Sequence, residues 1–303
     1  MFVVITDQTL DKRIIPNNVY IIDMSFYQLK KLIQKKFDFA INLDKPYKLC
    51  DFKPAYGDIF SYYIEKFKLD FWGFCDPDII WGKVKEQLDQ YDAFSGKYDK
   101  IGTLGHLQFF KNNKKNRMLY RQVITPKSFT DYRYVFSSRF SYNFDEQFGI
   151  NEIAKKEGLS ILDFSNIQAP YVDVLPNEFW FKDVNQGTTE DFQYFHWDQN
   201  EGLKQCYLDK SDNVVERNIS YVHFQKRAML VCVNVANVNR FFVIPNKFIT
   251  TENFKYVNFK KNKLYVSYRI YVFKHFFRKG NFSISSIRHK IEFKRMLKKF
   301  YKR

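Results

Sequence analysis

The sequence predicts an α/β fold built on a largely parallel sheet, and three observations predict it. Short apolar runs at Phe2–Asp7, Val19–Asp23 and Phe71–Cys75 have the length and composition of buried strands. Segments with apolar residues at helical spacing lie between these runs. With 45% hydrophobic and 19% aromatic residues, the chain also has ample side chains for a core. Alternating strands and helices are typical of layered α/β proteins with parallel strands.

Capping and spacing place the individual elements. Ser25 is a suitable N-cap for a helix with Phe26, Leu29, Leu32 and Ile33 on one side. Further helical segments are expected through residues 59–64, over 82–91 and near 151–156. Later strands are expected at Tyr98–Gly105, Tyr171–Leu175, Val214–His223 and Met229–Val235.

The length and the charge indicate one domain with an appendage. We assign residues 1–250 of the 303 to the domain and 251–303 to a basic, aromatic extension. The net charge is +16, and the last thirty residues hold eleven Lys and Arg against Glu292 alone. A helix over 286–302 would have an almost wholly cationic polar face, which suits an anionic membrane surface. The alternatives are a disordered basic tail and a helix packed on the domain.

The cysteines and the hydropathy favour a cytoplasmic protein. The four cysteines are Cys50, Cys75, Cys206 and Cys232, and they have no C-x-x-C spacing. We interpret them as small buried hydrophobic residues in a reducing compartment. No apolar run has the length of a membrane span, and the N-terminus lacks a signal-peptide pattern. We therefore expect a cytoplasmic protein that attaches peripherally to the inner face of the cell membrane.

The stretch Asp70–Gly82 carries the strongest chemical signal. Its apolar run Phe71–Cys75 has the composition of a strand covered on both faces. Asp76 and Asp78 follow, at the edge of the sheet where α/β proteins bind ligands. Two carboxylates at this spacing can hold a divalent cation together with a diphosphate. The plainer alternative is a strand followed by a polar turn.

Basic residues and a histidine accompany these acids further along the chain. His223 ends an expected strand and would be a good third ligand for a cation such as manganese. Lys226 and Arg227 follow and could neutralise a diphosphate leaving group. His106, after Gly105, could contact either substrate of a group-transfer reaction, the donor or the acceptor. For His223 and His106 alike, the alternative is a structural role.

Several of these motifs together resemble one bacterial family. The segments are Pro46–Gly57, Asp70–Gly82, Gly105–His106, Asp145–Glu146 and His223–Arg227. The family is similar to the GT-A-fold glycosyltransferases of capsule and lipopolysaccharide assembly, and the resemblance covers roughly residues 1–240. It implies a GT-A-like, Rossmann-like sheet with flanking helices, a nucleotide-diphosphate-sugar donor, a divalent metal (Mn²⁺ or Mg²⁺) and a glycan acceptor that is lipid-linked or free.

The resemblance also implies roles for particular residues. Asp76 would face the ribose and the metal, Asp78 would bind the metal directly, and His223 would complete the protein's share of the ligands. Lys48, Asp51 and Lys53 would lie near the nucleotide. For the two lysines the alternative is a solvated side chain, and for Asp51 it is a helix cap.

The start of the chain departs from the family pattern. The family begins with a strand and a helix before the one that matches Phe2–Asp7. The first strand of the nucleotide-binding half is therefore expected to be missing, through a late start codon or a truncation. An inactive remnant of a glycosyltransferase is the hypothesis that follows from this difference.

The pair Asp145–Glu146 is the candidate for acceptor chemistry. Inverting sugar transfer needs a carboxylate that takes the proton of the acceptor hydroxyl. Retaining transfer would use a group on the other face of the donor, and the spacing does not separate the two. An exposed acidic turn before the helix near 151–156 is the structural alternative.

Two further hypotheses concern aromatic and basic residues. The run Phe192–Trp197 and Trp180 could stack on sugars, although core packing explains most aromatic side chains of so aromatic a chain. A nucleic-acid-binding protein is the rival to a glycosyltransferase, because of the net charge and the aromatic residues. Against it, most of the positive excess lies in the tail and no helix-turn-helix, zinc-finger or RNP-like motif is present.

Overall fold

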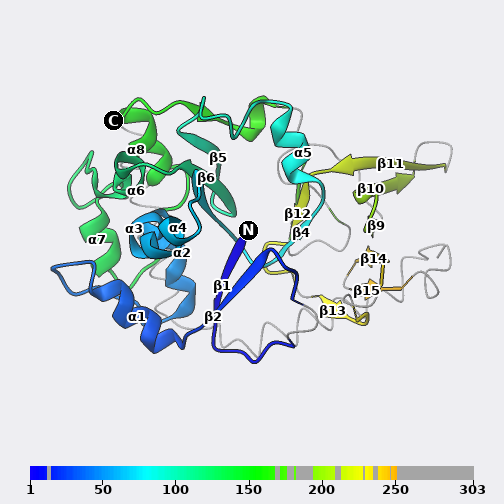
Figure 1. Ribbon diagram of the computed structural model, residues 1–303, viewed down its shortest axis with the longest axis horizontal. Helices are drawn as coiled ribbons and strands as arrows, with labels where there is room; N and C mark the ends of the chain where they lie inside the picture. Colours follow the sequence, from blue (N-terminus) through cyan, green and yellow to red (C-terminus); the bar gives the residue numbers. More distant parts are fainter. Residues whose placement is uncertain are drawn as a thin grey trace. The chain divides into compact units, whose positions relative to one another are not determined.

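The computed structural model describes residues 1–11, 15–167, 171–175, 181, 194–208, 213–227, 229–234, 238–245 and 247–250. Within them the chain has both helices and strands, which confirms the α/β class (Figure 1). The extension 251–303, its expected helix over 286–302 and Trp180 lie outside the described residues. No helix in the described part combines the length and apolarity needed to cross a membrane.

The chain divides into two compact units. The first contains residues 1–75 and 93–166, and the second contains residues 76–92 and those from 167 onward. The chain therefore leaves the first unit between Cys75 and Asp76, immediately before the acidic motif, and returns to it at Ala93.

The first unit holds most of the helices that the described residues form. Its helices are α1 (Phe26–Gln34), α2 (Leu49–Phe52), α3 (Tyr56–Ile59), α4 (Ser61–Lys66), α6 (Lys114–Arg117), α7 (Tyr132–Ser137) and α8 (Ile150–Lys156). Its strands are β1 (Phe2–Thr6), β2 (Val19–Asp23), β3 (Phe71–Cys75), β5 (Lys100–Leu104), β6 (Leu107–Lys111) and β7 (Ile161–Leu162). Stacked aromatic rings form part of the core, including Phe52 on Phe136 at 4.2 Å between ring centroids.

Helix α1 begins as its sequence predicts. The Ser25 hydroxyl accepts the backbone N–H of Gln28, and the Gln28 side chain accepts the N–H of Ser25. This reciprocal capping box satisfies two donors that a helix start leaves without partners. Leu29 and Ile33 form the buried side of the helix.

The expectation of a largely parallel sheet is wrong. Strands β1 and β2 pair in parallel as a two-stranded sheet, but the four-stranded sheet β3-β6-β5-β7 has only one parallel pair, β5 with β7. The physical reason is the short turn between β5 and β6, because a two-residue connection can join only antiparallel strands.

The expectation that Phe71–Cys75 is covered on both faces is also wrong. Trp72 and Phe74 are buried, whereas Gly73 is exposed and Phe71 and Cys75 are partly exposed. Within the described residues β3 pairs with β6 alone and is an edge strand. The run is apolar because aromatic rings pack along it, with Trp72 stacked on Phe110 and Phe71 edge-on to Phe94.

The second unit is rich in strands. Its elements are β4 (Ile79–Trp81), α5 (Val84–Asp89), β8 (Val172–Asp173), β9 (Tyr194–Asp198), β10 (Gly202–Leu208), β11 (Val214–Ile219), β12 (Tyr221–His223), β13 (Leu230–Val231), β14 (Arg240–Ile244) and β15 (Lys247–Ile249). They form a six-stranded sheet, β11-β10-β9-β14-β15-β13, and a three-stranded sheet, β4-β12-β8. Most of these strand pairs are antiparallel; β12 with β8 and β13 with β15 are parallel.

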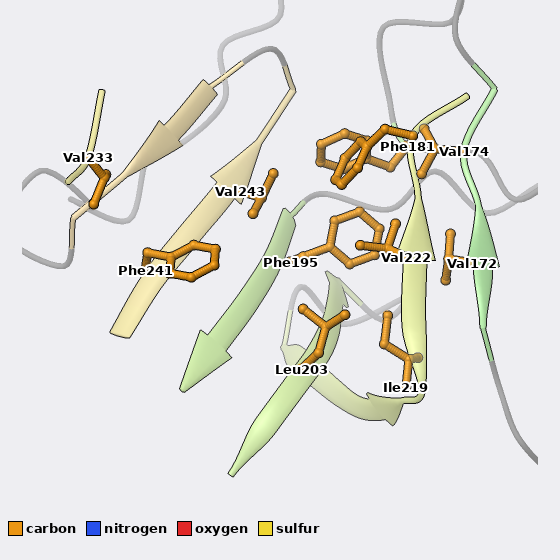
Figure 2. Close-up of a cluster of buried hydrophobic side chains, with 11 residues drawn as sticks. Val172, Val174, Phe181, Phe195, Leu203, Ile219, Val222, Val233, Phe241 and Val243 are labelled. Atoms are coloured by element: carbon orange, nitrogen blue, oxygen red, sulfur yellow. The ribbon is translucent and has the colours of Figure 1, made fainter. Parts of the chain in front are cut away.

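One apolar core joins the two sheets of the second unit. Val172 and Val222 of the three-stranded sheet contribute to the same cluster as Phe195, Leu203 and Val243 of the six-stranded sheet (Figure 2). Side chains alternate across a strand, so the neighbours of Val172 and Val222 in sequence face away from this core. That alternation sets the position of the residues described next.

The prediction of buried cysteines holds for Cys206 only. Cys50 and Cys75 are partly exposed, and Cys232 is exposed. All four lie in the described part of the chain and are free thiols. Cys232 lies between the exposed Val231 and Val233, whose side chain enters the core of the second unit.

Candidate metal centre

The candidate centre is built on the three-stranded sheet of the second unit. Strand β12 lies between β4 and β8, and the pairing register sets His223 opposite Ile79 on one side and Asp173 on the other. Because Val172 and Val222 face the core, Asp173 and His223 share the opposite face.

Two acids reach the same histidine from the segment before β4. The Nε2 atom of His223 lies 3.3 Å from Asp78 Oδ1 and 3.6 Å from Asp76 Oδ2. One ligand atom from each of these three residues lies within 4.8 Å of the others. His223 is 7% exposed, whereas the Asp76 and Asp78 side chains are 29% and 28% exposed and therefore accessible to an ion from solvent.

Asp173 holds the other side of the imidazole ring. Its Oδ1 lies 2.9 Å from Nδ1 of His223, at hydrogen-bonding distance, and both residues are buried. A carboxylate on Nδ1 keeps a proton there and leaves Nε2 to act as the ligand atom. The sequence reasoning missed Asp173; its signal was a single acid inside an otherwise apolar strand, Tyr171–Val174.

The turn after β12 fixes Asp78. The backbone N–H of Lys226 donates to Asp78 Oδ2 at 2.6 Å, and that of Phe224 donates to the Asp78 carbonyl at 3.0 Å. Gln225 and Lys226 both have positive φ, 46° and 63°, the left-handed conformation that turns the chain back on itself. Asp78 is therefore oriented by main-chain contacts, with its Oδ1 toward His223.

The charges of the cluster favour a cation. Burial would lower the pKa of His223, but Asp173 and Asp78 raise it to about 9. Burial would likewise raise the pKa of Asp78, but the hydrogen bonds from His223 and from the Lys226 N–H lower it to about 2. Without a metal, a proton on His223 supplies the positive charge that these carboxylates require.

The donor set fits a divalent ion. Two carboxylates and an imidazole suit ions such as manganese, and the Asp173–His223 contact is the supporting contact that metal-bound histidines usually have. Asp76, Asp78 and His223 would hold the ion and Asp173 would orient His223. The three residues thus come together as the sequence predicts.

The basic residues next to His223 have different surroundings. Lys226 is exposed and touches the cluster through its backbone N–H. Arg227 is 5% exposed; it donates to the Leu175 carbonyl at 3.2 Å and lies over the Phe181 ring at 4.9 Å. Of the two, Lys226 is the one with its side chain in solvent.

Lys48 and Asp51 form a buried ion pair in the first unit. Their charged groups lie 2.6 Å apart, and Lys48 also donates to the carbonyls of Val135 and Phe140. The Asp51 carboxylate accepts the backbone N–H groups of Tyr142 and Phe144. The pair therefore ties the segment around α2 to residues 135–144.

Lys53 and Asp145 form a second buried pair in the first unit. Lys53 Nζ lies 2.9 Å from Asp145 Oδ2 and 2.8 Å from the carbonyl of Gly105. Asp145 is 2% exposed, and burial raises the pKa of its carboxyl to about 7 although Lys53 opposes the shift. Its Oδ1 is buried and accepts no hydrogen bond from the described residues.

Glu146 and His106 flank this pair. Glu146 is exposed, and its side chain passes so close to Gly105 that a Cβ there would lie 2.7 Å from Glu146 Cγ. His106 follows Gly105 in the turn between β5 and β6 and is buried. A side chain at position 105 would therefore require the exposed Glu146 side chain to move.

The comparisons with known proteins give the family and nothing finer. A model of a family of unknown function, DUF6625, matches residues 1–252, and the chain belongs to this family. No curated protein and no solved structure matches the chain.

Proposed function

We propose that this protein is a metal-dependent glycosyltransferase that moves a sugar from a nucleotide-diphosphate donor to an acceptor of a bacterial surface polysaccharide. The proposal includes the GT-A-like arrangement that the motifs resemble. The observation that carries it is the convergence of Asp76, Asp78 and the Asp173-oriented His223 on one small region.

The cluster supports diphosphate chemistry in particular. A divalent ion there would neutralise the charge that develops on a departing nucleoside diphosphate. Asp78 is fixed by the turn and by His223, and Asp76 lies 3.6 Å from the same imidazole nitrogen. Lys226, exposed beside Asp78, adds a positive charge for the same leaving group.

The acceptor proton requires a carboxylate that solvent reaches. Of the two acids predicted for this role, Asp145 is buried and bound to Lys53, whereas Glu146 is exposed. Between these two acids of the first unit, Glu146 is therefore the one that solvent reaches, and Asp145 is a structural partner of Lys53.

Donor cleavage tests the proposal. Purified protein is incubated with UDP-, GDP- and dTDP-sugars and Mn²⁺, and the released nucleoside diphosphate is measured. We expect one donor class to be cleaved by the wild type and not by Asp78→Ala, because that change removes a metal ligand and the acceptor of the Lys226 N–H. Asp89→Ala, which removes an exposed acid paired with Lys85, is the matched control and should retain activity. Failure to cleave any donor, or equal activity of Asp78→Ala, would overturn the assignment.

A further inference from the structure

The face of the three-stranded sheet that carries the metal cluster also carries a row of aromatic rings. His223 and Tyr221 lie two residues apart on β12 and therefore share a face. The pairing register sets Trp81 of β4 opposite Tyr221. Tyr171, just before β8, contacts Tyr221 from the other side. The order across the sheet is thus Trp81, Tyr221, Tyr171.

The central ring of this row supports the outer two. Tyr221 is 1% exposed, and Tyr171 stacks on it at 5.2 Å with an interplanar angle of 13°. Trp81 lies 5.9 Å from Tyr221 and is tilted by 52°. Both outer rings remain partly exposed.

Two hydrogen bonds fix the backbone at Trp81 and Gly82. The indole N–H of Trp197 donates to the Trp81 carbonyl at 3.1 Å, and the N–H of Gly82 donates to the Ser220 carbonyl at 2.8 Å. Trp197 itself packs against the apolar core of the unit. The backbone of Trp81 is thus fixed, and its ring lies against Tyr221 with part of its surface in solvent, an arrangement that reduces the ordering cost of binding a ligand.

The distance from the cluster decides what kind of ligand fits. Residues two apart on a strand are separated by roughly 6.8 Å, which is about the size of one sugar ring. The sugar of a nucleotide-diphosphate sugar is attached directly to the diphosphate, whereas the base is separated from it by a ribose. A ring next to the diphosphate is therefore one of two sugars, the ribose or the transferred sugar, and the broad C–H face of a pyranose suits aromatic rings better than the ribose does.

We propose that Trp81 and Tyr171 form a subsite for a pyranose ring beside the metal cluster, an inference that rests on the proposed function. The apolar C–H face of a pyranose packs on the electron-rich face of an aromatic ring, and its hydroxyls stay in water. Tyr221 is the support of the subsite and does not touch the sugar.

Saturation-transfer NMR tests the subsite without metal or nucleotide. The probes are the methyl pyranosides of glucose, galactose and N-acetylglucosamine, with uridine as the competing class. At least one pyranoside should receive saturation at its ring protons from the wild type. Trp81→Leu and Tyr171→Leu should each weaken its binding about three- to tenfold, the range expected for one lost ring contact.

Two further variants separate binding from folding. Trp81→Phe keeps a ring and should retain most of the binding, whereas Tyr62→Leu removes an exposed tyrosine of the first unit and should change nothing. Circular dichroism of each variant identifies any that fails to fold. If Trp81→Leu fails to fold, the pyranoside binding of Tyr171→Leu and Trp81→Phe tests the subsite in its place.

The two proposals fail in different experiments. Loss of Mn²⁺-dependent donor cleavage counts against the proposed function alone, because the NMR samples contain neither metal nor nucleotide. The subsite is overturned if no pyranoside is saturated by the wild type, if Trp81→Leu and Tyr171→Leu bind as the wild type does, or if uridine alone is saturated.

Discussion

Three carboxylates face the two ring nitrogens of His223. Asp173 lies 2.9 Å from Nδ1, and Asp78 and Asp76 lie 3.3 Å and 3.6 Å from Nε2. A histidine in the core for packing alone would not need them, because burying charged groups is costly unless they are paired. The arrangement is explained if Nε2 and the carboxylates of Asp76 and Asp78 coordinate one cation while Asp173 keeps the ring in place.

Asp173 is therefore expected to control metal affinity without touching the metal. Asp173→Ala should weaken Mn²⁺ binding by roughly 10- to 100-fold, as observed for residues that orient metal-bound histidines. Isothermal titration calorimetry measures the affinity, and NMR of the His223 ring nitrogens reports whether the proton leaves Nδ1. Asp89→Asn is the matched control. Unchanged affinity and an unchanged tautomer would remove this role from Asp173.

Lys100 is a buried ionisable residue with a different role. Its side chain is 0% exposed; its ammonium donates to the Gly102 carbonyl and lies 5.3 Å from the Phe110 ring centroid. Burial lowers its pKa from 10.5 to about 7, with Asp163 opposing the shift and Lys155 adding to it. Lys100 belongs to the first unit and is not one of the residues of the candidate centre, so we expect its effect in stability.

The free energy of unfolding should depend on pH through Lys100. Between about pH 7 and 10.5 the side chain of Lys100 is protonated in the unfolded chain and neutral in the folded one. The free energy of unfolding therefore increases with pH over this range, because the cost of burying the charged ammonium disappears. Lys100→Met should be more stable than the wild type at pH 6, and the difference should shrink toward pH 10. Urea unfolding at a series of pH values measures it. A difference that does not vary with pH would contradict the lowered pKa.

The sequence predicts the three expected metal ligands better than it predicts the residue that orients one of them. Asp76, Asp78 and His223 are recognisable because carboxylates at this spacing and a strand-end histidine have few other uses in combination. Asp173 is not, since one acid in a strand has no sequence pattern that links it to a residue fifty positions away. For Lys53 and Asp145, the sequence shows the charges but cannot show that they are buried against each other.

At the level of elements, local signals are reliable and pairing signals are not. The capping box predicts the start of α1, because Ser25 and Gln28 lie within one turn. The direction of strand pairing depends on partners distant in sequence, and β3 pairs with β6 more than thirty residues later. The apolar run of β3 indicated burial on both faces, but in so aromatic a chain apolar residues also occupy partly exposed positions.

Gly82 tests the contact that positions β4 beside β12. A Cβ on Gly82 would lie 2.3 Å from the carbonyl oxygen of Ile219 and 3.0 Å from that of Ser220. Both are backbone atoms of the partner segment, so the strands would have to separate. Gly82→Ala should reduce the free energy of unfolding by about 1–3 kcal/mol.

Urea unfolding measures this change, and the neighbouring residue provides the control. Lys83→Ala alters an exposed side chain and should change stability by no more than about 0.5 kcal/mol. Gly82→Ala should also weaken Mn²⁺ binding, because Asp78 immediately precedes β4. A Gly82→Ala protein as stable as Lys83→Ala would show that the strands tolerate the side chain.

For the whole molecule, the candidate centre depends on segments far apart in the chain. Asp173 and His223 come from two strands of one sheet in the second unit, and Asp76 and Asp78 come from the segment just before a third strand, β4. Residue types and strand ends predict such a centre, but only the folded sheet gives the distances. The proposed function therefore depends on whether these side chains bind a metal together.

Calorimetric titration of Mn²⁺ into the full-length protein, with and without UDP, is the measurement that tests this directly. The wild type should bind one ion, and Asp78→Ala and His223→Ala should each lose that binding while retaining the wild-type circular dichroism spectrum. UDP should tighten the binding, because a diphosphate supplies further oxygen ligands to the ion. An absence of Mn²⁺ binding by the wild type, or equal binding by Asp78→Ala and His223→Ala, would contradict the metal centre.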